Sequence, residues 1–261
     1  MNEQTKKDVR FLIDDNKRAI KNPLPKIALK EDPDLLVKER KDLERCINEV
    51  LTAIQQQYAE LLPFVKELRK HIRDITEESH ICAVYLLLCH ASQDWNSLFL
   101  LGKHGDLTMQ IVFRRIKESL ALTELFTLEY RDGTRKNLDK WFSGNIIDHS
   151  LCRDAQEKFF QEMPENKGID IKTMLTRLYQ SESLATHVSY STMLECISPF
   201  TEDFDFSGRT QYFRTCHALP YAKGVMDAMN ITLKLVYLFL MKDSRGYERL
   251  DEILVRHARN D

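Results

Sequence analysis

The sequence predicts an all-α protein, a bundle of about six helices, because it combines few helix breakers with many helix formers. Only 8 Gly and 7 Pro interrupt the 261 residues, while Leu, Glu, Lys, Arg, Gln and Met, which favour helices, recur throughout. Several segments also repeat apolar residues at spacings of three and four, the period of one helix face. With 43% hydrophobic residues over this length, a sizeable buried core is expected.

Charge and cysteine usage exclude some partners and compartments. The 38 Lys and Arg nearly balance the 40 Asp and Glu, so any nucleic-acid binding needs a local basic patch. The six cysteines form no C-x-x-C and no signal peptide opens the chain, which predicts reduced thiols in a cytoplasm. The most apolar stretch, residues 231–241, is shorter than the roughly 20 residues that cross a bilayer. We therefore expect a cytoplasmic protein without membrane contact.

Residues 33–77 are predicted to form one long helix, after an N-terminal segment and linker over residues 1–32 that Pro23 and Pro25 interrupt. Pro63 lies inside the helix and should bend or divide it. The helix is an arm that binds a second copy or another protein, or it packs along its own bundle. Its apolar residues alternate at four and three, the heptad spacing of a coiled-coil seam: Ile47, Leu51, Ile54, Tyr58, Leu61, Val65, Leu68, Ile72 and Ile75.

Residues 78–261 are predicted to form the bundle domain. We expect helices over 78–101, 107–130, 170–197 and 219–241, an irregular segment over 135–163 broken at Gly144, and a short amphipathic tail. Residues 201–215 do not follow a helical pattern, because Phe204 and Phe206 alternate with aspartates before a Ser-Gly turn. A small β-hairpin reaching from Phe204 to Phe213 and an irregular aromatic loop are equal expectations.

The helix over 107–130 carries two charged residues on the stripe that we expect to face the core. Arg114 and Glu118 are four residues apart, so they share a face and can pair. Burying both costs desolvation that the pair only partly recovers. The pair is therefore a functional feature, a buried bridge between helices, or a pair that a small rotation places at a wet edge. The full stripe is Leu107, Ile111, Arg114, Glu118, Ala121 and Leu125.

The helix over 170–197 carries a matching polar face, with Tyr179, Ser183 and His187 one turn apart. If the two helices adjoin, His187 could move a proton at neutral pH, with Arg114 holding a phosphate. In the alternative interpretation His187 is a core histidine bonded to Glu118. Both interpretations depend on the two helices meeting.

Two segments resemble the paired signatures of the bacterial domain of unknown function 5677 family, R-x-x-x-E and Y-x-x-x-S-x-x-x-H-x-S. The first is Phe113-Arg114-Arg115-Ile116-Lys117-Glu118, and the second begins at Tyr179 and ends at Ser189. The resemblance covers roughly residues 81–241 in the order of helices. It implies a helical bundle that gathers five side chains, with Ser189 as a further binding candidate, and it implies no established activity. The five are Arg114, Glu118, Tyr179, Ser183 and His187.

A weaker association is with HEPN ribonucleases, helical bundles whose sites use an R-x4–6-H motif. Arg73 and His80 have this spacing, but they fall between two predicted helices, whereas that motif usually lies near the end of the bundle. We therefore do not assign the site to them. The association keeps RNA as a candidate partner, because Arg, His and a carboxylate suit transphosphorylation to a 2′-hydroxyl.

The sequence predicts neither a metal nor a cofactor. Glu77 and His80 form one E-x-x-H, but a di-metal bundle needs this motif twice. Cys82, Cys89 and His90 lack the spacing of a zinc site. No nucleotide-binding loop or standard hydrolase motif occurs.

Two function hypotheses follow. In the first, this is an intracellular bacterial RNA-cleaving toxin or defence protein, in which Arg114 binds phosphate, His187 moves a proton and Glu118 orients one of them. In the second, it is a non-catalytic interaction module, the same residues are structural, and the heptad helix mediates assembly.

Overall fold

The computed structural model describes residues 33–103, 109–162 and 209–258, and these ranges contain seven α-helices and no strand. The prediction of an all-α bundle is confirmed. The long helices are α2 (Pro33–Leu68), α3 (His80–Lys103), α4 (Met109–Arg131), α9 (Arg209–Leu235) and α10 (Ser244–Ala258), and the short ones are α5 (Lys136–Phe142) and α6 (His149–Gln161). A 3-10 turn, Arg69–His71, extends α2, and a π-helical segment, Val236–Met241, extends α9.

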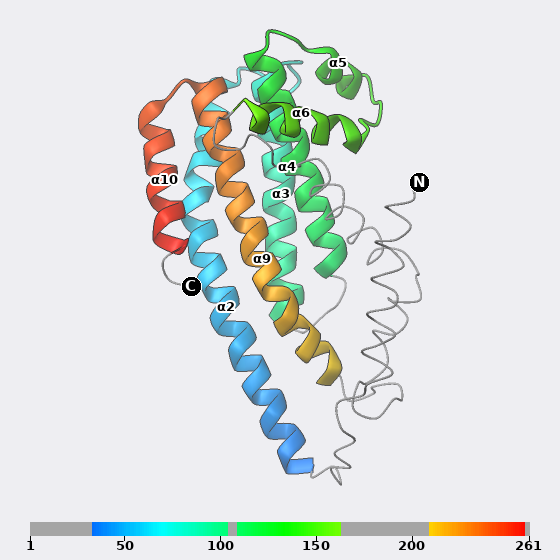
Figure 1. The fold of residues 1–261 in the computed structure, drawn as a ribbon, viewed down its shortest axis with the longest axis vertical. Helices are drawn as coiled ribbons and strands as arrows, with labels where there is room; N and C mark the ends of the chain where they lie inside the picture. The colour runs from blue at the N-terminus through cyan, green and yellow to red at the C-terminus, as the bar shows by residue number, and fades with distance from the viewer. Residues whose placement is uncertain (1–32, 104–108, 163–208, 259–261) are drawn as a thin grey trace.

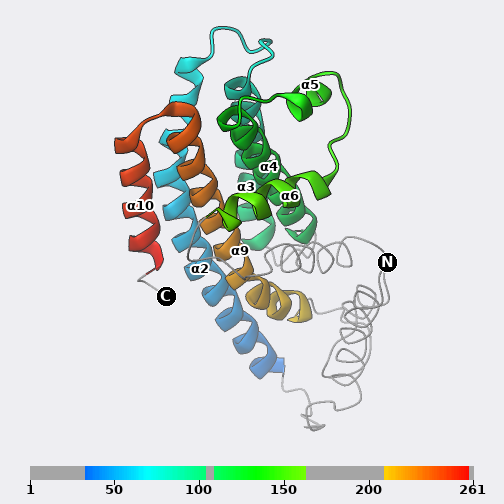
Figure 2. The ribbon, with the colours of Figure 1, turned by 45° about the horizontal axis from the view of Figure 1, so that its top comes forward.

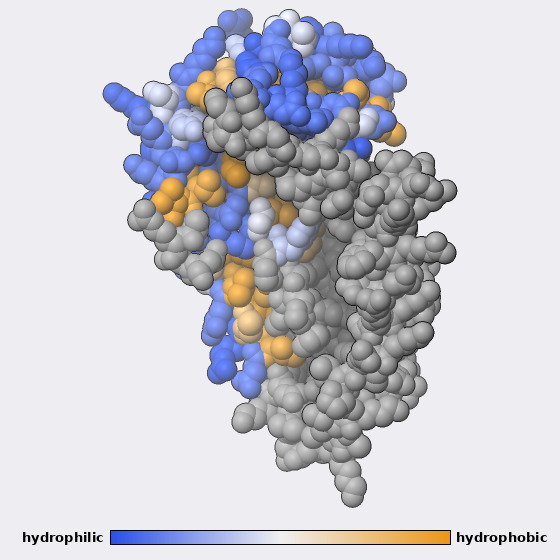
Figure 3. Space-filling view, viewed as in Figure 1, coloured by the Kyte–Doolittle hydropathy of each residue, from blue (hydrophilic) through white to orange (hydrophobic). Residues whose placement is uncertain are grey.

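The long helices pack lengthwise in one bundle. Helices α2 and α9 lie side by side and run in the same direction, while α3 and α10 run the opposite way (Figures 1 and 2). Helix α4 packs against both α3 and α9. Helices α5 and α6 lie at the upper end of the view, where the surface is mostly hydrophilic (Figure 3).

The heptad seam of α2 is buried inside this chain. Its apolar residues from Ile47 to Ile72 belong to the core and contact α3 and α9, which is the arrangement of a long helix packed along its own bundle. The helix ends at Leu68, and Ile75 lies beyond it with 42% of its surface exposed. Pro63 does not divide α2, because it lies on the exposed side while buried Leu61 and Phe64 on either side keep the helix packed.

Helix α4 buries a different stripe from the one expected. Ile111 is 48% exposed, and Arg114 and Glu118 lie at the edge of the core rather than in it. The buried face includes hydroxyl residues, whose donors are satisfied by carbonyl oxygens one turn earlier: Thr123 Oγ1 donates to Ser119 O at 2.8 Å, and Thr127 Oγ1 to Thr123 O at 2.7 Å. The buried face therefore lies nearly opposite the expected stripe, a difference of almost half a turn at about 100° per residue. The buried residues include Val112, Phe113, Ile116, Ser119, Leu120, Thr123, Phe126 and Thr127.

Three further expectations concern the hairpin, the break at Gly144 and the helix over residues 170–197. The segment from Arg209 to Phe213 is helical, so the second half of the expected hairpin is instead the start of α9. Tyr212 and Phe213, which were expected to form the second strand, follow Arg209 in the first turns of this helix. The break at Gly144 is confirmed, because it has φ +79° between α5 and α6. The predicted helix over 170–197 lies outside the described residues.

Within the described residues one segment, Tyr221–Met241, is long and apolar enough to cross a membrane. Its polar residues, however, are used inside the bundle. Lys223 Nζ pairs with Asp227 at 2.9 Å, and Gln57 Nε2 from α2 donates to the same carboxylate at 2.8 Å. Met226, Met229 and Leu233 are fully buried on the same helix. These contacts fit a core helix of a bundle.

Helix α4 also places a carboxyl group between α6 and α9. Gln156 Nε2 and Thr232 Oγ1 both donate to the Glu124 carboxylate, the latter at 2.6 Å. Burial raises the pKa of Glu124 above its ordinary value, although both donors act in the opposite direction. The folded chain therefore holds this proton more tightly than the unfolded chain does.

This shift predicts a pH dependence of stability. A raised folded-state pKa contributes stability below the unfolded value of 4.5, and that contribution is lost as the pH rises through the folded value. We expect the melting temperature of the wild type, relative to Glu124→Gln, to fall as the pH rises above the unfolded value of 4.5. Glu49→Gln on the exposed side of α2 is the matched control. If the melting temperature of the wild type instead rose relative to that of Glu124→Gln as the pH increased, the prediction would be contradicted.

Candidate functional site

A pocket of about 410 Å³ opens between α3, α4 and α5, a size within the roughly 300–1,000 Å³ usual for small-molecule sites. One part of its lining is apolar and the other carries charged and hydroxyl groups. Leu86, Leu87 and His90 come from α3, Arg115, Glu118, Ser119 and Leu122 from α4, and Trp141 from α5. The residues therefore converge from three elements, as the lining of a binding site does.

The polar side of the pocket is built on a buried carboxylate. Asp94 is only 6% exposed, and its Oδ1 lies 3.1 Å from Nη2 of Arg115, whose own side chain is 51% exposed. The same Nη2 lies 3.0 Å from Nε2 of His90. Within the described part of the chain, the Arg115 guanidinium contacts both groups through this one nitrogen, and Arg115 also lines the pocket. A buried anion that fixes an exposed cation by one edge leaves the rest of the fork available for a ligand.

The hydrogen bonds of His90 determine its tautomer. Arginine can only donate, so Nε2 of His90 accepts from Arg115 and the ring is neutral. The proton is then on Nδ1, which lies 3.0 Å from Ser119 Oγ and donates to it. The second oxygen of Asp94, 3.6 Å from the same Nδ1, has no hydrogen-bond partner among the described residues. If Arg115 turned away, Nε2 of His90 would be left with a free lone pair.

The predicted pair of α4 lies beside this pocket. Arg114 Nε donates to Glu118 Oε1 at 2.8 Å, and the two side chains are 23% and 32% exposed. This is the wet-edge arrangement named above as an alternative. A histidine of α6 joins the pair, because His149 Nε2 lies 3.4 Å from Glu118 Oε1. Glu118 therefore lines the pocket and also ties α4 to α6.

The structure brings together some of the predicted site residues. Arg114 and Glu118 are in contact, while Tyr179, Ser183, His187 and Ser189 lie outside the described residues. Sequence reasoning did not place His90, Arg115 and Ser119 in the site, and it missed Asp94 and His149, which contact residues of the pocket from behind its lining. The available signal was the spacing of four between a histidine and an aspartate on an otherwise apolar helix.

The other sequence candidates do not form a comparable arrangement. Arg73 lies in the exposed loop before α3. His80 Nε2 is 3.1 Å from the carbonyl oxygen of Thr134, its ring stacks edge-on against Tyr130, and burial lowers its pKa. Within the described part of the chain, no group of three or more His, Cys, Asp or Glu is placed to hold a metal ion.

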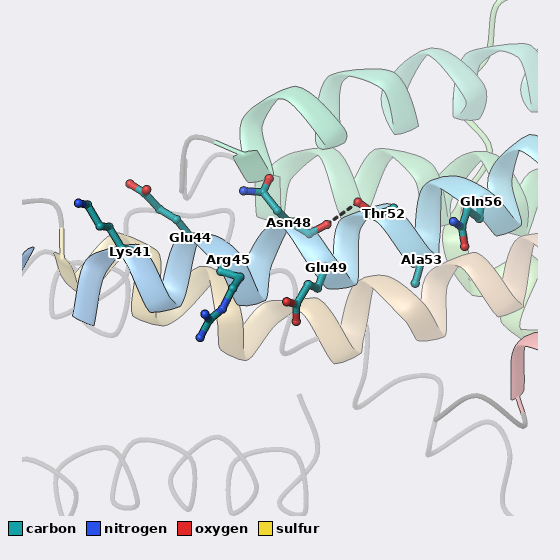
Figure 4. Close-up of a pocket in the computed structure, with 8 residues that line it drawn as sticks. All are labelled: Lys41, Glu44, Arg45, Asn48, Glu49, Thr52, Ala53 and Gln56. Carbon is teal, nitrogen blue, oxygen red and sulfur yellow. Dashed lines mark hydrogen bonds between the residues drawn. The ribbon is translucent and has the colours of Figure 1, made fainter. Parts of the chain in front are cut away.

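A second hollow follows the outer face of α2, and Figure 4 shows its residues along one side of that helix. All the described residues that line it come from α2, among them Lys41, Arg45 and Glu49. The drawn hydrogen bond joins Thr52 Oγ1 to Asn48 O at 2.6 Å within the same helix. No second described element contributes a group, so this face is a poorer candidate, and its arginine is a useful control position.

A second buried carboxylate positions the wall of the pocket. Glu129 of α4 is 7% exposed and accepts hydrogen bonds from the backbone N–H groups of Asn137 and Leu138 at 2.9 and 3.1 Å, and from the Asn137 side chain at 2.9 Å. These N–H groups belong to the first turn of α5, where the helix leaves its donors unpaired and favours a negative charge. Glu129 thus caps α5 from another helix and so holds Trp141.

Removal of this cap should loosen α5. We expect Glu129→Ala to lower the free energy of unfolding by about 2–3 kcal/mol, the usual scale for hydrogen bonds to a buried charge, and to change the fluorescence of Trp141 in the folded state. Glu129→Gln keeps one acceptor oxygen, so its free energy of unfolding should fall by less than that of Glu129→Ala. Urea unfolding followed by tryptophan fluorescence measures both effects, with exposed Glu248→Ala as the control. Equal stability of Glu129→Ala and the wild type would show that the cap is unimportant.

Three comparisons with known proteins were made, and none found a relative of this chain. No family model, no curated protein and no solved structure matches the chain.

Proposed function

We propose that this protein is a cytoplasmic bacterial enzyme that cleaves RNA, as a toxin or defence protein would, and that the α3–α4 pocket binds the phosphate at the cleaved bond. One observation carries the proposal: Arg115 is held by one nitrogen against a buried aspartate while half of its side chain stays exposed at the pocket. Phosphate oxygens pair well with a guanidinium presented in this way.

The chemistry needs a base, an acid and a cation. In transphosphorylation the 2′-oxygen forms a bond to phosphorus, the bond from phosphorus to the 5′-oxygen breaks, a base takes the 2′-hydroxyl proton and an acid protonates the leaving oxygen. When Arg115 turns to the phosphate, it releases Nε2 of His90, which then acts as the base. Arg114 and Glu118 lie at the same edge, and a second histidine, His149 or the predicted His187, supplies the acid.

A second candidate function rests on a specific observation. Both arginines at the pocket already pair with carboxylates, Arg114 with Glu118 and Arg115 with Asp94. In this alternative the network holds α3, α4 and α6 together, and the protein is a non-catalytic interaction module. Because the seam of α2 is buried in its own bundle, a second copy or a protein partner would have to bind another face of that helix.

Cleavage of a labelled single-stranded RNA by the purified full chain tests the proposal. We expect products that end in a 2′,3′-cyclic phosphate, and no cleavage of an oligonucleotide with a 2′-deoxy sugar at the cleaved position. His90→Gln should lower the rate by about 10²–10⁴, the usual contribution of a general base. Arg115→Lys keeps the charge beside Asp94 but loses the planar fork, so it should lower the rate while the melting temperature holds.

The control is Arg45→Lys on the outer face of α2, where the side chain is 71% exposed and pairs with Asp42. Its rate should equal that of the wild type. An intact RNA after incubation with the wild type would contradict the proposal. Variants of His90 and Arg115 that unfold would favour the structural network.

A further inference from the structure

We propose that the α3–α4 pocket recognises one nucleotide of single-stranded RNA, with the base against Trp141 and the leucines and the phosphate at Arg115. This inference rests on the proposed function, because it names the ligand class of the same pocket. It adds a base-binding half that the cleavage chemistry does not require.

The apolar half of the pocket is a wall built by Leu86, Leu87, Leu122 and Trp141. Trp141 is partly exposed, and its ring is supported by Phe126 at 5.6 Å and Phe142 at 5.1 Å between ring centroids. A supported aromatic ring in a concave site is a platform for a flat ligand, and stacking of a nucleobase on such a ring contributes about 1–3 kcal/mol. The wall therefore favours a ligand with an aromatic ring.

The polar half requires that the same ligand carry an anionic group. Arg115 presents N–H donors at the pocket, and Glu118 presents a carboxylate that can accept from an amino group of a base or from a sugar hydroxyl. A fatty acid could pack against the apolar wall and pair with Arg115, but its apolar chain would then lie against the Glu118 carboxylate. Free phosphate could pair with Arg115 but would leave the apolar wall exposed to water. A nucleotide can contact all three features of the pocket, which are the apolar wall, Arg115 and Glu118.

The spacing along α4 also fits a nucleotide. Arg115, Glu118 and Leu122 lie on one side of α4 and all line the pocket. Arg115 and Leu122 are seven residues apart, which places them about 10 Å apart along the helix at about 1.5 Å per residue. A nucleoside monophosphate is comparable in length. The pocket therefore accepts the base at the Leu122 and Trp141 end and the phosphate at the Arg115 end.

Tryptophan fluorescence can report this binding directly. The chain has two tryptophans, and Trp95 is fully buried while Trp141 lines the pocket. We expect adenosine 5′-monophosphate to quench the fluorescence saturably in the wild type and in Trp95→Phe. Ribose 5-phosphate, which lacks the base, should bind at least tenfold more weakly and should not quench.

Three variants separate the two halves of the site, with binding measured by calorimetry. Trp141→Leu should weaken binding of adenosine 5′-monophosphate roughly 5- to 150-fold, the range that corresponds to the loss of one stacked base. Trp141→Phe keeps an aromatic platform, so it should retain most of the affinity even if the leucine variant fails to fold. Arg115→Lys should weaken binding at least tenfold, whereas Arg45→Lys should leave it unchanged.

The outcomes distinguish this inference from the proposed function. Equal binding of adenosine 5′-monophosphate, ribose 5-phosphate and inorganic phosphate would overturn base recognition and leave an anion pocket. Absence of nucleotide binding at millimolar concentration would also overturn it, even if RNA were cleaved. Base-dependent binding without RNA cleavage would support the inference and remove the proposed enzymatic activity.

Discussion

Helix α4 buries a face on which serine and threonine alternate with large apolar residues. The hydroxyls of Thr123 and Thr127 donate to carbonyl oxygens one turn earlier, so they enter the core without losing a hydrogen bond. This choice of face fixes the rotation of α4 about its axis. It brings Arg115 and Glu118 to a pocket edge, where they can meet a ligand. If α4 were rotated by about one residue, so that this flank turned towards the core, both side chains would be buried against the bundle.

The second constraint is the desolvation of Asp94. An ionised carboxylate that is almost removed from water is stabilised only by a nearby cation and by hydrogen bonds. Arg115 supplies the cation and His90 lies beside both groups. The aspartate therefore restricts the guanidinium at its inner edge, and Arg115, by donating to Nε2, places the proton of His90 on Nδ1. A ligand that draws Arg115 outward changes the partners of both residues at once.

The fold class and the heptad seam could be predicted from the sequence, because both depend on the spacing of apolar residues, and the seam residues are buried in the structure. It was insufficient for the rotation of α4. Ser119, Thr123 and Thr127 look polar in a hydrophobicity pattern, and only their backbone hydrogen bonds show why they can be buried. The pair of Arg114 and Glu118 followed from spacing alone, whereas its contact with His149 joins residues 31 positions apart and no local pattern encodes it. The predicted role of His187 stays a prediction.

The two buried carboxylates that hold residues of the pocket argue for a rigid site. Asp94 holds the cation of the pocket, and Glu129 holds the short helix that carries its aromatic wall. A bundle that needed only stability could replace a buried ionic group with an apolar one at little cost. Here each carboxylate instead fixes a partly exposed side chain that lines the same pocket from a different element. Cleavage further requires that Arg115 release His90, while base binding requires only that Arg115 and Trp141 stay where these carboxylates hold them. The two proposals therefore depend on different movements of the same residues, and the wall can bind a base even in a protein whose histidine never takes a proton.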